Sequence, residues 1–99
     1  MSETASRERA QAMLDAVPFH RAVLRPRVAA VARSVGGLDV VLEPSPDLCR
    51  ADDGPAVHGG IVASLIDAAA YNAVALHLER ATPTLDLRID YLRPAVPPL

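Results

Sequence analysis

Asp67 is the residue whose surroundings point most directly to chemistry. It lies in an otherwise apolar run, IVASLIDAAAYNAVA, among Ala, Leu, Ile and Val side chains. Burying a carboxylate costs free energy, so an acid in such a run is expected to be either paired or reactive. On a helix, Ser64 and Tyr71 would share its face, three positions before it and four after it. Their hydroxyls, or an arginine such as Arg88, would hold a structural Asp67, whereas a reactive Asp67 would be a nucleophile or general base.

A His-Gly-Gly sequence, His58-Gly59-Gly60, stands directly before this run. Glycines at a loop-to-helix junction let a ligand approach the backbone closely. The first amides of a helix lack intrahelical partners and carry the positive end of its dipole, so they can polarise a carbonyl or stabilise an oxyanion. The alternative is that Gly59 and Gly60 only permit tight packing. His58 is either a catalytic group or, more simply, a side chain that positions the loop by hydrogen bonding.

Several other chemistries lack their motifs. The three histidines show no ligand spacing and Cys49 stands alone, so no metal site is expected. The sequence contains no G-x-S-x-G or phosphate-loop pattern, and we expect no cofactor. Four arginines cluster before position 34 and are predicted to form a solvated surface rather than a phosphate site. They are Arg21, Arg25, Arg27 and Arg33.

Composition describes a single small globular domain. Of 99 residues, 51% are hydrophobic and 22% charged, and the net charge of −2 predicts no nucleic-acid partner. All basic residues are arginine and alanine is abundant, which is typical of GC-rich bacterial genomes. The single cysteine and the polar residues 1–9 favour the cytoplasm. The apolar stretch 61–76 is shorter than the roughly 20 residues that cross a bilayer, so no membrane association is expected.

The sequence predicts four elements. Residues 1–17 contain a helix, strongest over 5–17, which Pro18 ends. A strand pair follows at 28–43 around Gly36-Gly37. The central helix covers 59–78, and residues 84–93 alternate apolar and polar side chains as a half-buried strand does. A helix apolar nearly all round must be wrapped, and a curved antiparallel sheet would wrap it in an α+β fold. Three strands are too few, so further strands or another chain must contribute.

These residues together resemble a known family. The pattern consists of His58-Gly59-Gly60, Leu65, Asp67, Ala69, Thr84 and Tyr91-Leu92-Arg93-Pro94-Ala95. It is similar to the hotdog-fold acyl-CoA thioesterases of the phenylacetyl-CoA thioesterase type. Pro18-Phe19-His20-Arg21 also resembles a short segment that these proteins often carry. The resemblance implies a hotdog fold, a long central helix wrapped by a curved antiparallel sheet. Residues 1–99 would then be one incomplete domain whose C-terminal strands are missing.

The resemblance also implies a mechanism and partners. The Gly59 amide would polarise the thioester carbonyl of an acyl-CoA, while the Asp67 carboxylate attacks it or activates water. The Thr84 hydroxyl would orient that water, and His58 is included among the catalytic candidates. Substrate binding is assigned to Gly60, Asp52, Ser64 and Tyr71. The family brings the glycine loop of one protomer to the acid of another, which implies a homodimer or homotetramer.

One departure from the family keeps an alternative open. Relatives place an asparagine six residues before the histidine, where this chain has Asp52. An ionised carboxylate cannot donate a hydrogen bond, and its charge opposes a developing oxyanion. The alternative is an inactive hotdog fragment that binds acyl-CoA or a partner chain. A hotdog dehydratase is less consistent, because its motif differs from the His-Gly-Gly-to-Asp spacing found here.

Overall fold

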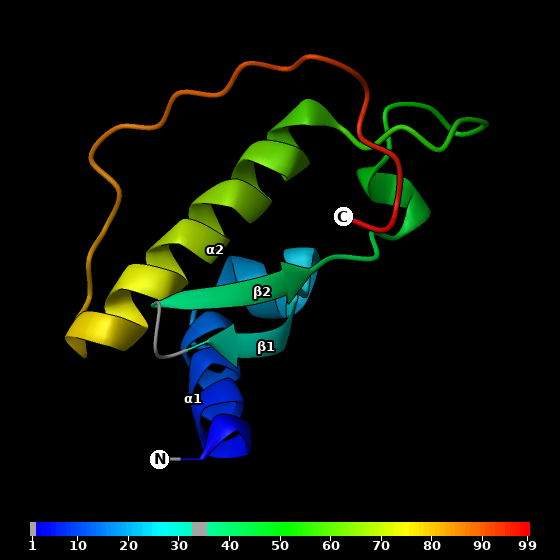
Figure 1. Ribbon diagram of the computed structural model, residues 1–99. Helices are drawn as coiled ribbons and strands as arrows, with labels where there is room; N and C mark the ends of the chain where they lie inside the picture. The colour runs from blue at the N-terminus through cyan, green and yellow to red at the C-terminus, as the bar shows by residue number, and fades with distance from the viewer. Residues whose placement is uncertain (1, 33–35) are drawn as a thin grey trace.

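The computed structural model describes residues 2–32 and 36–99. It contains helix α1 (Glu3–Asp15), the π-helix η1 (His20–Leu24), strands β1 (Arg27–Ala32) and β2 (Gly37–Val41), the 3-10 helix η3 (Pro46–Leu48) and helix α2 (Gly59–Leu78). Figure 1 shows the two strands between α1 and the long α2. Helix α2 has the bounds that the sequence predicted, and α1 begins and ends two residues before the predicted 5–17.

Helix α1 begins at a serine cap and turns small and apolar side chains inward. The Ser2 hydroxyl accepts a hydrogen bond of 3.0 Å from the Ala5 amide, which satisfies one of the unpaired amides at the helix start. Ser6, Ala10 and Leu14 are buried at a spacing of four residues, as expected of one helix face. The inward face is therefore narrow and lets α1 lie close to β1 and α2.

Strands β1 and β2 form an antiparallel pair. Arg27 lies opposite Val41 and Ala32 opposite Gly37, with a register irregularity between Val28 and Ala30. Gly36 has a φ of 69°, a conformation that glycine adopts without a steric penalty. Residues 33–35, which complete the connection, lie outside the described residues, and so does the part of the solvated-surface prediction that concerns Arg33. The other arginines of the predicted solvated surface, at positions 21, 25 and 27, are exposed.

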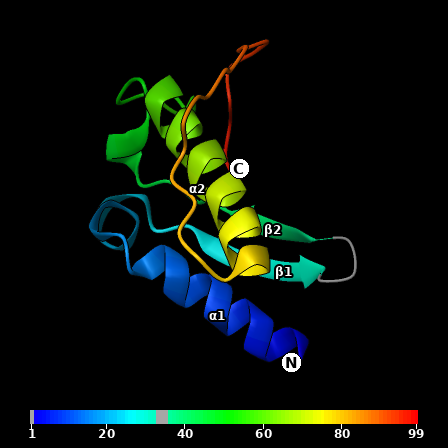
Figure 2. The same ribbon diagram turned by 90° about the vertical axis from the view of Figure 1, so that its left-hand side faces the viewer.

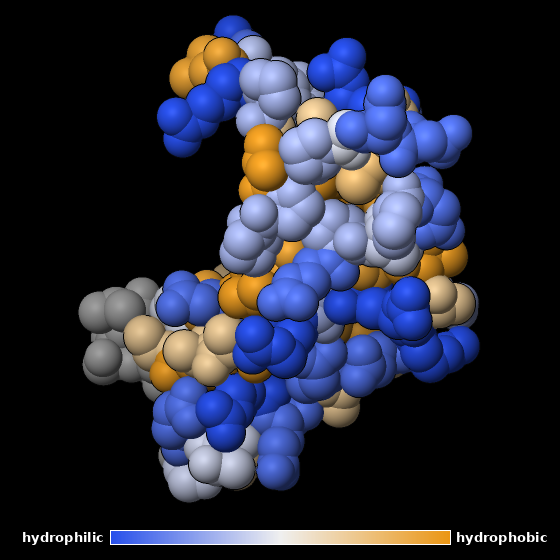
Figure 3. Space-filling view, turned by 90° about the vertical axis from the view of Figure 1, so that its right-hand side faces the viewer, coloured by the Kyte–Doolittle hydropathy of each residue, from blue (hydrophilic) through white to orange (hydrophobic). Residues whose placement is uncertain are grey.

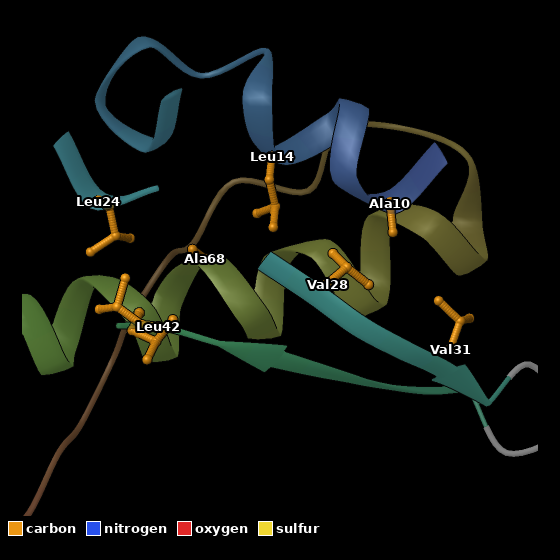
Figure 4. Packing of buried hydrophobic residues seen from close by; sticks show 8 residues of the cluster. Ala10, Leu14, Leu24, Val28, Val31, Leu42 and Ala68 are labelled. Atoms are coloured by element: carbon orange, nitrogen blue, oxygen red, sulfur yellow. The ribbon is translucent and has the colours of Figure 1, made fainter. Parts of the chain in front are cut away.

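The core lies where α1, β1 and α2 meet. Its buried members come from α1, η1, β1 and α2 and from the residue directly after β2 (Figure 4): Ala10, Leu14, Leu24, Val28, Val31, Leu42, Leu65 and Ala68. Asn72 of α2 is fully buried, and its amide donates to the Ala10 carbonyl at 3.2 Å. A buried polar group needs such a partner, so this bond fixes how α2 sits against α1.

Helix α2 is covered on one side only. Leu65, Ala68, Asn72 and Ala75 are buried, whereas apolar residues on its other side, such as Val74, stay about half exposed. In the space-filling view, apolar residues reach the surface beside the overhanging C-terminal segment (Figure 3). By length and composition this 20-residue helix passes the test for a membrane span, a test that core helices of soluble proteins also pass. The helix extends two residues beyond each end of the apolar stretch 61–76, and this brings it to the length of a membrane span.

The chain after α2 differs from the sequence prediction. Residues 84–93 form no strand and instead run back past α2 as an extended segment (Figure 2). A strand requires a hydrogen-bonded neighbour, and β1 and β2 pair only with each other in the described part of the chain. Leu85 and Leu92 are consequently 102% and 93% exposed. The alternating pattern of residues 84–93 indicates a tendency to form a strand, but no strand in the described part of the chain pairs with this segment.

The C-terminal segment is nevertheless attached at its far end. The Val57 amide donates to the Ala95 carbonyl at 2.8 Å. Leu42 and Leu99 exchange two backbone hydrogen bonds of 2.8 and 2.9 Å, one in each direction. Leu99 also packs against the core cluster. These contacts fix the path of the segment across the N-terminal end of α2.

Replacing Leu14 by alanine should test the core. Leu14 is fully buried, so Leu14→Ala removes buried apolar surface and leaves a cavity, and we expect the free energy of unfolding to fall by about 2–5 kcal/mol. Urea denaturation followed by circular dichroism measures it. The matched control, Leu85→Ala, truncates a fully exposed leucine and should stay within about 0.5 kcal/mol of wild type. Equal losses for both variants would contradict this core.

Candidate active site

His58 begins α2 as its cap residue. Its φ of −56° and ψ of 133° are non-helical, and its ring Nδ1 accepts a hydrogen bond of 2.9 Å from the Gly60 amide. Its carbonyl accepts from the Ile61 and Val62 amides at 2.9 and 3.2 Å. The geometry agrees with the interpretation that the ring positions the loop. A Cβ atom on Gly60 would come within 3.1 Å of Nδ1, so a glycine here leaves room for the capping ring.

Asp67 and Thr84 are brought together by the return of the chain. The Thr84 hydroxyl donates a hydrogen bond to the Asp67 carboxylate, across 17 positions of sequence. Asp67 is half-buried rather than fully buried. Two residues that were assigned to the same site from sequence therefore do meet, although nothing in their spacing required it.

Two of the three partners that the sequence offered for a structural Asp67, Ser64 and Arg88, are engaged elsewhere. The Ser64 hydroxyl donates to the Gly60 carbonyl at 2.8 Å, a common way for serine to satisfy itself within a helix. The Arg88 guanidinium lies 3.4 Å from the Asp90 carboxylate. Tyr71 shares a hollow with Asp67, but no hydrogen bond joins the two among the described residues. The Asp67 partner is Thr84, which the helical spacing argument could not identify.

A hollow of about 330 Å³ opens at the Asp67–Thr84 pair. It is lined by Val17, His20, Asp67, Ala68, Tyr71, Pro83 and Thr84. His20 was considered from sequence only as a metal ligand and as part of a family-like segment. Its Nδ1 atom is buried and has no hydrogen-bond partner among the described residues. The sequence signal that marked its neighbourhood was the Pro18-Phe19-His20-Arg21 segment.

A second hollow, of about 640 Å³, lies at the start of α2. Gly59, Val62, Tyr91 and Arg93 are among the residues that line it. The Tyr91 hydroxyl donates to the Gly59 carbonyl at 2.7 Å. The Gly59 amide donates no hydrogen bond within residues 2–32 and 36–99. This amide is the first of α2. It therefore lies at the positive end of the helix dipole, beside the second hollow.

The two hollows are too far apart to act together within one chain. Gly59 and Asp67 are eight positions apart on the same straight helix. At 1.5 Å of rise per residue, their backbones are separated by about 12 Å along the axis. The amide would have to contact the carbonyl oxygen of a thioester and the carboxylate its carbonyl carbon, and these two atoms are only about 1.2 Å apart. The Gly59 amide and the Asp67 carboxylate of a single chain therefore cannot both contact one thioester group.

Asp52 is not brought to either hollow. It is exposed in the turn at 51–53, which the Arg50 amide closes by donating to the Ala56 carbonyl at 2.8 Å. Neither hollow includes it among its lining residues. Among the described ranges, no group of three His, Cys, Asp or Glu side chains is placed to hold a metal ion.

Comparison with known proteins identifies the family. The thioesterase superfamily model matches residues 54–98, a range that contains Gly59, Asp67, Thr84 and Tyr91. A crystal structure of a protein from the thioesterase superfamily is similar to the chain, with a TM-score of 0.80 and 32% identity, over 95% of this chain and 68% of that one. The chain belongs to the thioesterase superfamily. No curated protein matches it in sequence.

Membership in the thioesterase superfamily confirms the predicted α+β hotdog class. The two-stranded antiparallel sheet and the long helix correspond to that fold. It also accounts for the apolar character of α2, which is the core helix of the fold and not a membrane span. The superfamily indicates a hydrolase that acts on thioesters.

Removing the His58 ring should weaken the start of α2. His58→Ala leaves the Gly60 amide without its acceptor, and we expect a loss of about 0.5–2 kcal/mol in the free energy of unfolding. Asparagine is a good cap residue, so His58→Asn should recover most of that loss. Thermal and urea unfolding measure both variants. Equal stability of His58→Ala and wild type would exclude the capping role.

Proposed function

We propose that this chain is a subunit of an acyl-CoA thioesterase of the phenylacetyl-CoA thioesterase type, which hydrolyses a thioester to a free acid and CoA. The observation that carries the proposal is the hydrogen bond between Thr84 and Asp67 at the edge of a hollow. An acid so held can face a bound acyl group from within an apolar helix. Membership in the thioesterase superfamily supports the choice of reaction.

Two routes use these groups. In the first, the Asp67 carboxylate attacks the thioester carbon, the carbon–sulfur bond breaks, and CoA leaves as a thiolate that takes a proton from water. A second water then hydrolyses the resulting anhydride. In the second route, Asp67 takes a proton from a water molecule as the water oxygen attacks the same carbon. The carbon–sulfur bond then breaks, and Asp67 returns the proton to the departing CoA thiolate. Thr84 serves both routes, because its hydroxyl fixes the orientation of the carboxylate.

The carbonyl oxygen requires a donor, and we assign the Gly59 amide to it. Among the described residues this amide has no acceptor, and it lies at the positive end of α2. Because about 12 Å of helix separates it from Asp67 of the same chain, the two groups must come from different protomers. The proposal therefore includes a homodimer, with Gly59 of one protomer facing Asp67 of its partner. Gly60 is the second glycine of the same loop at the start of α2.

The exposed position of Asp52 favours a second candidate function. Where relatives carry an asparagine donor, this chain has a carboxylate that lies outside both hollows. With one donor fewer, the site would bind an acyl-CoA and turn it over slowly or not at all. Acyl-CoA binding by folded wild-type protein without thiol release would decide for this second candidate.

Substitution of the acid tests the thioesterase directly. Asp67→Asn keeps the size and the Thr84 contact but removes the charge, and we expect thiol release from a panel of aryl and medium-chain acyl-CoAs to fall by at least about 10²-fold. The control is Asp86→Asn, the same change on an exposed aspartate that lines neither hollow. It should retain wild-type rates. Unchanged turnover in Asp67→Asn would refute the assignment.

A mixing experiment tests whether the site is shared. Proline has no N–H and is well suited to the first position of a helix, and the extended ψ of His58 suits a residue before proline. Gly59→Pro therefore removes the proposed donor with little strain, whereas Gly59→Ala keeps it. The alanine Cβ would lie at an ordinary 3.5 Å from the Tyr91 ring. We expect Gly59→Pro to be inactive and Gly59→Ala active.

The informative sample contains two inactive variants together. When Gly59→Pro and Asp67→Asn chains are unfolded, mixed and refolded, half of the dimers are mixed, and each mixed dimer has one site with both wild-type groups. Recovery of about a quarter of wild-type activity is expected for a two-fold symmetric dimer. If each site lay within one chain, no wild-type pair would form and the mixture would stay inactive.

A further inference from the structure

The peptide that joins Gly59 to Gly60 is held at both ends by side chains. Its carbonyl oxygen accepts a hydrogen bond of 2.7 Å from the Tyr91 hydroxyl. Its N–H donates a hydrogen bond of 2.9 Å to Nδ1 of His58. Hydrogen bonds linked through one polar group strengthen each other, because each polarises the next. Tyr91, the peptide and His58 therefore form one continuous chain of three groups.

This arrangement determines which nitrogen of His58 carries the proton. A neutral imidazole has one N–H and one bare nitrogen. Since Nδ1 accepts from the Gly60 amide, the proton resides on Nε2. In the other tautomer two N–H groups would face each other. The exposed ring of His58 thus offers its Nε2–H as a second donor at the same end of α2 as the Gly59 amide.

Tyr91 reaches this position because the C-terminal segment crosses the start of α2 (Figure 1). The ring lies against Gly59, since a Cβ atom built there would be 3.5 to 3.6 Å from three of its atoms. The nearby bond from the Val57 amide to the Ala95 carbonyl, at 2.8 Å, fixes the segment beyond it. Tyr91 is itself 55% exposed, so burial of its ring does not account for its placement.

We propose that Tyr91 is a positioning residue, which through the Gly59–Gly60 peptide holds His58 as an Nε2–H donor beside the Gly59 amide. Together these two N–H groups form a donor pair for the carbonyl oxygen of an acyl thioester. The inference rests on the proposed function for its substrate. The hydrogen-bonded chain itself depends only on the described contacts.

Tyr91→Phe removes the hydroxyl and keeps the ring against Gly59. The Gly60 amide then becomes a weaker donor to His58, so the amide proton resonance of Gly60 and the ring nitrogen resonances of His58 should shift in NMR spectra recorded without substrate. We expect hydrogen exchange of the Gly60 amide to quicken about fivefold, as for the loss of one neutral hydrogen bond. With acyl-CoA, kcat should fall about fivefold to tenfold while KM stays unchanged.

The control is Leu85→Ala, which alters a fully exposed residue of the same segment and should leave both sets of resonances and kcat unchanged. Wild-type Gly60 and His58 resonances in Tyr91→Phe would overturn the inference, even if its melting temperature fell. Shifted resonances with a wild-type kcat would overturn the catalytic part. If wild-type protein hydrolyses no acyl-CoA, the proposed function fails, whereas the NMR comparison still decides the role of Tyr91.

Discussion

The fixed rise of an α-helix constrains this protein more than any other feature. Helix α2 carries both groups that we propose for thioester hydrolysis, an amide at its start and a carboxylate eight residues later. A rigid helix holds them about 12 Å apart, and no side-chain rearrangement within one chain closes that distance. The proposed active arrangement therefore depends on a second copy of α2. Apolar residues on one side of the helix, such as Val74, stay about half exposed.

The segment that follows α2 links its two ends. It contributes Thr84 to the carboxylate near the middle of the helix and Tyr91 to the peptide at its start. Between these contacts its leucines are largely exposed, so a few polar contacts and the anchoring of Leu99 maintain its path. Stability and function are coupled here, because loosening this segment would release the partners of both candidate groups. The α1–α2 contact through Asn72 is independent of it.

Much of the fold could be predicted from local pattern. The length of the apolar run and the glycines before it placed α2, and β-branched residues around a glycine pair placed the hairpin, because these signals depend on neighbours in sequence. The prediction of a strand at 84–93 did not hold, since its alternation is a local property but strand formation requires a partner. Similarly, the partner of Asp67 is a residue 17 positions away, which helical spacing could not reveal.

The sequence by itself determined the chemistry that is available: an acid in an apolar helix, a His-Gly-Gly helix start, and the family pattern that contains both. These follow from residue type and short-range spacing, which survive in any fold that keeps the helix. Only the tertiary structure decided which groups meet. It paired Thr84 with Asp67, set Tyr91 on the peptide after Gly59, fixed the tautomer of His58 and left Asp52 in solvent. Each of these depends on how the chain returns across α2, and that path is set by long-range contacts.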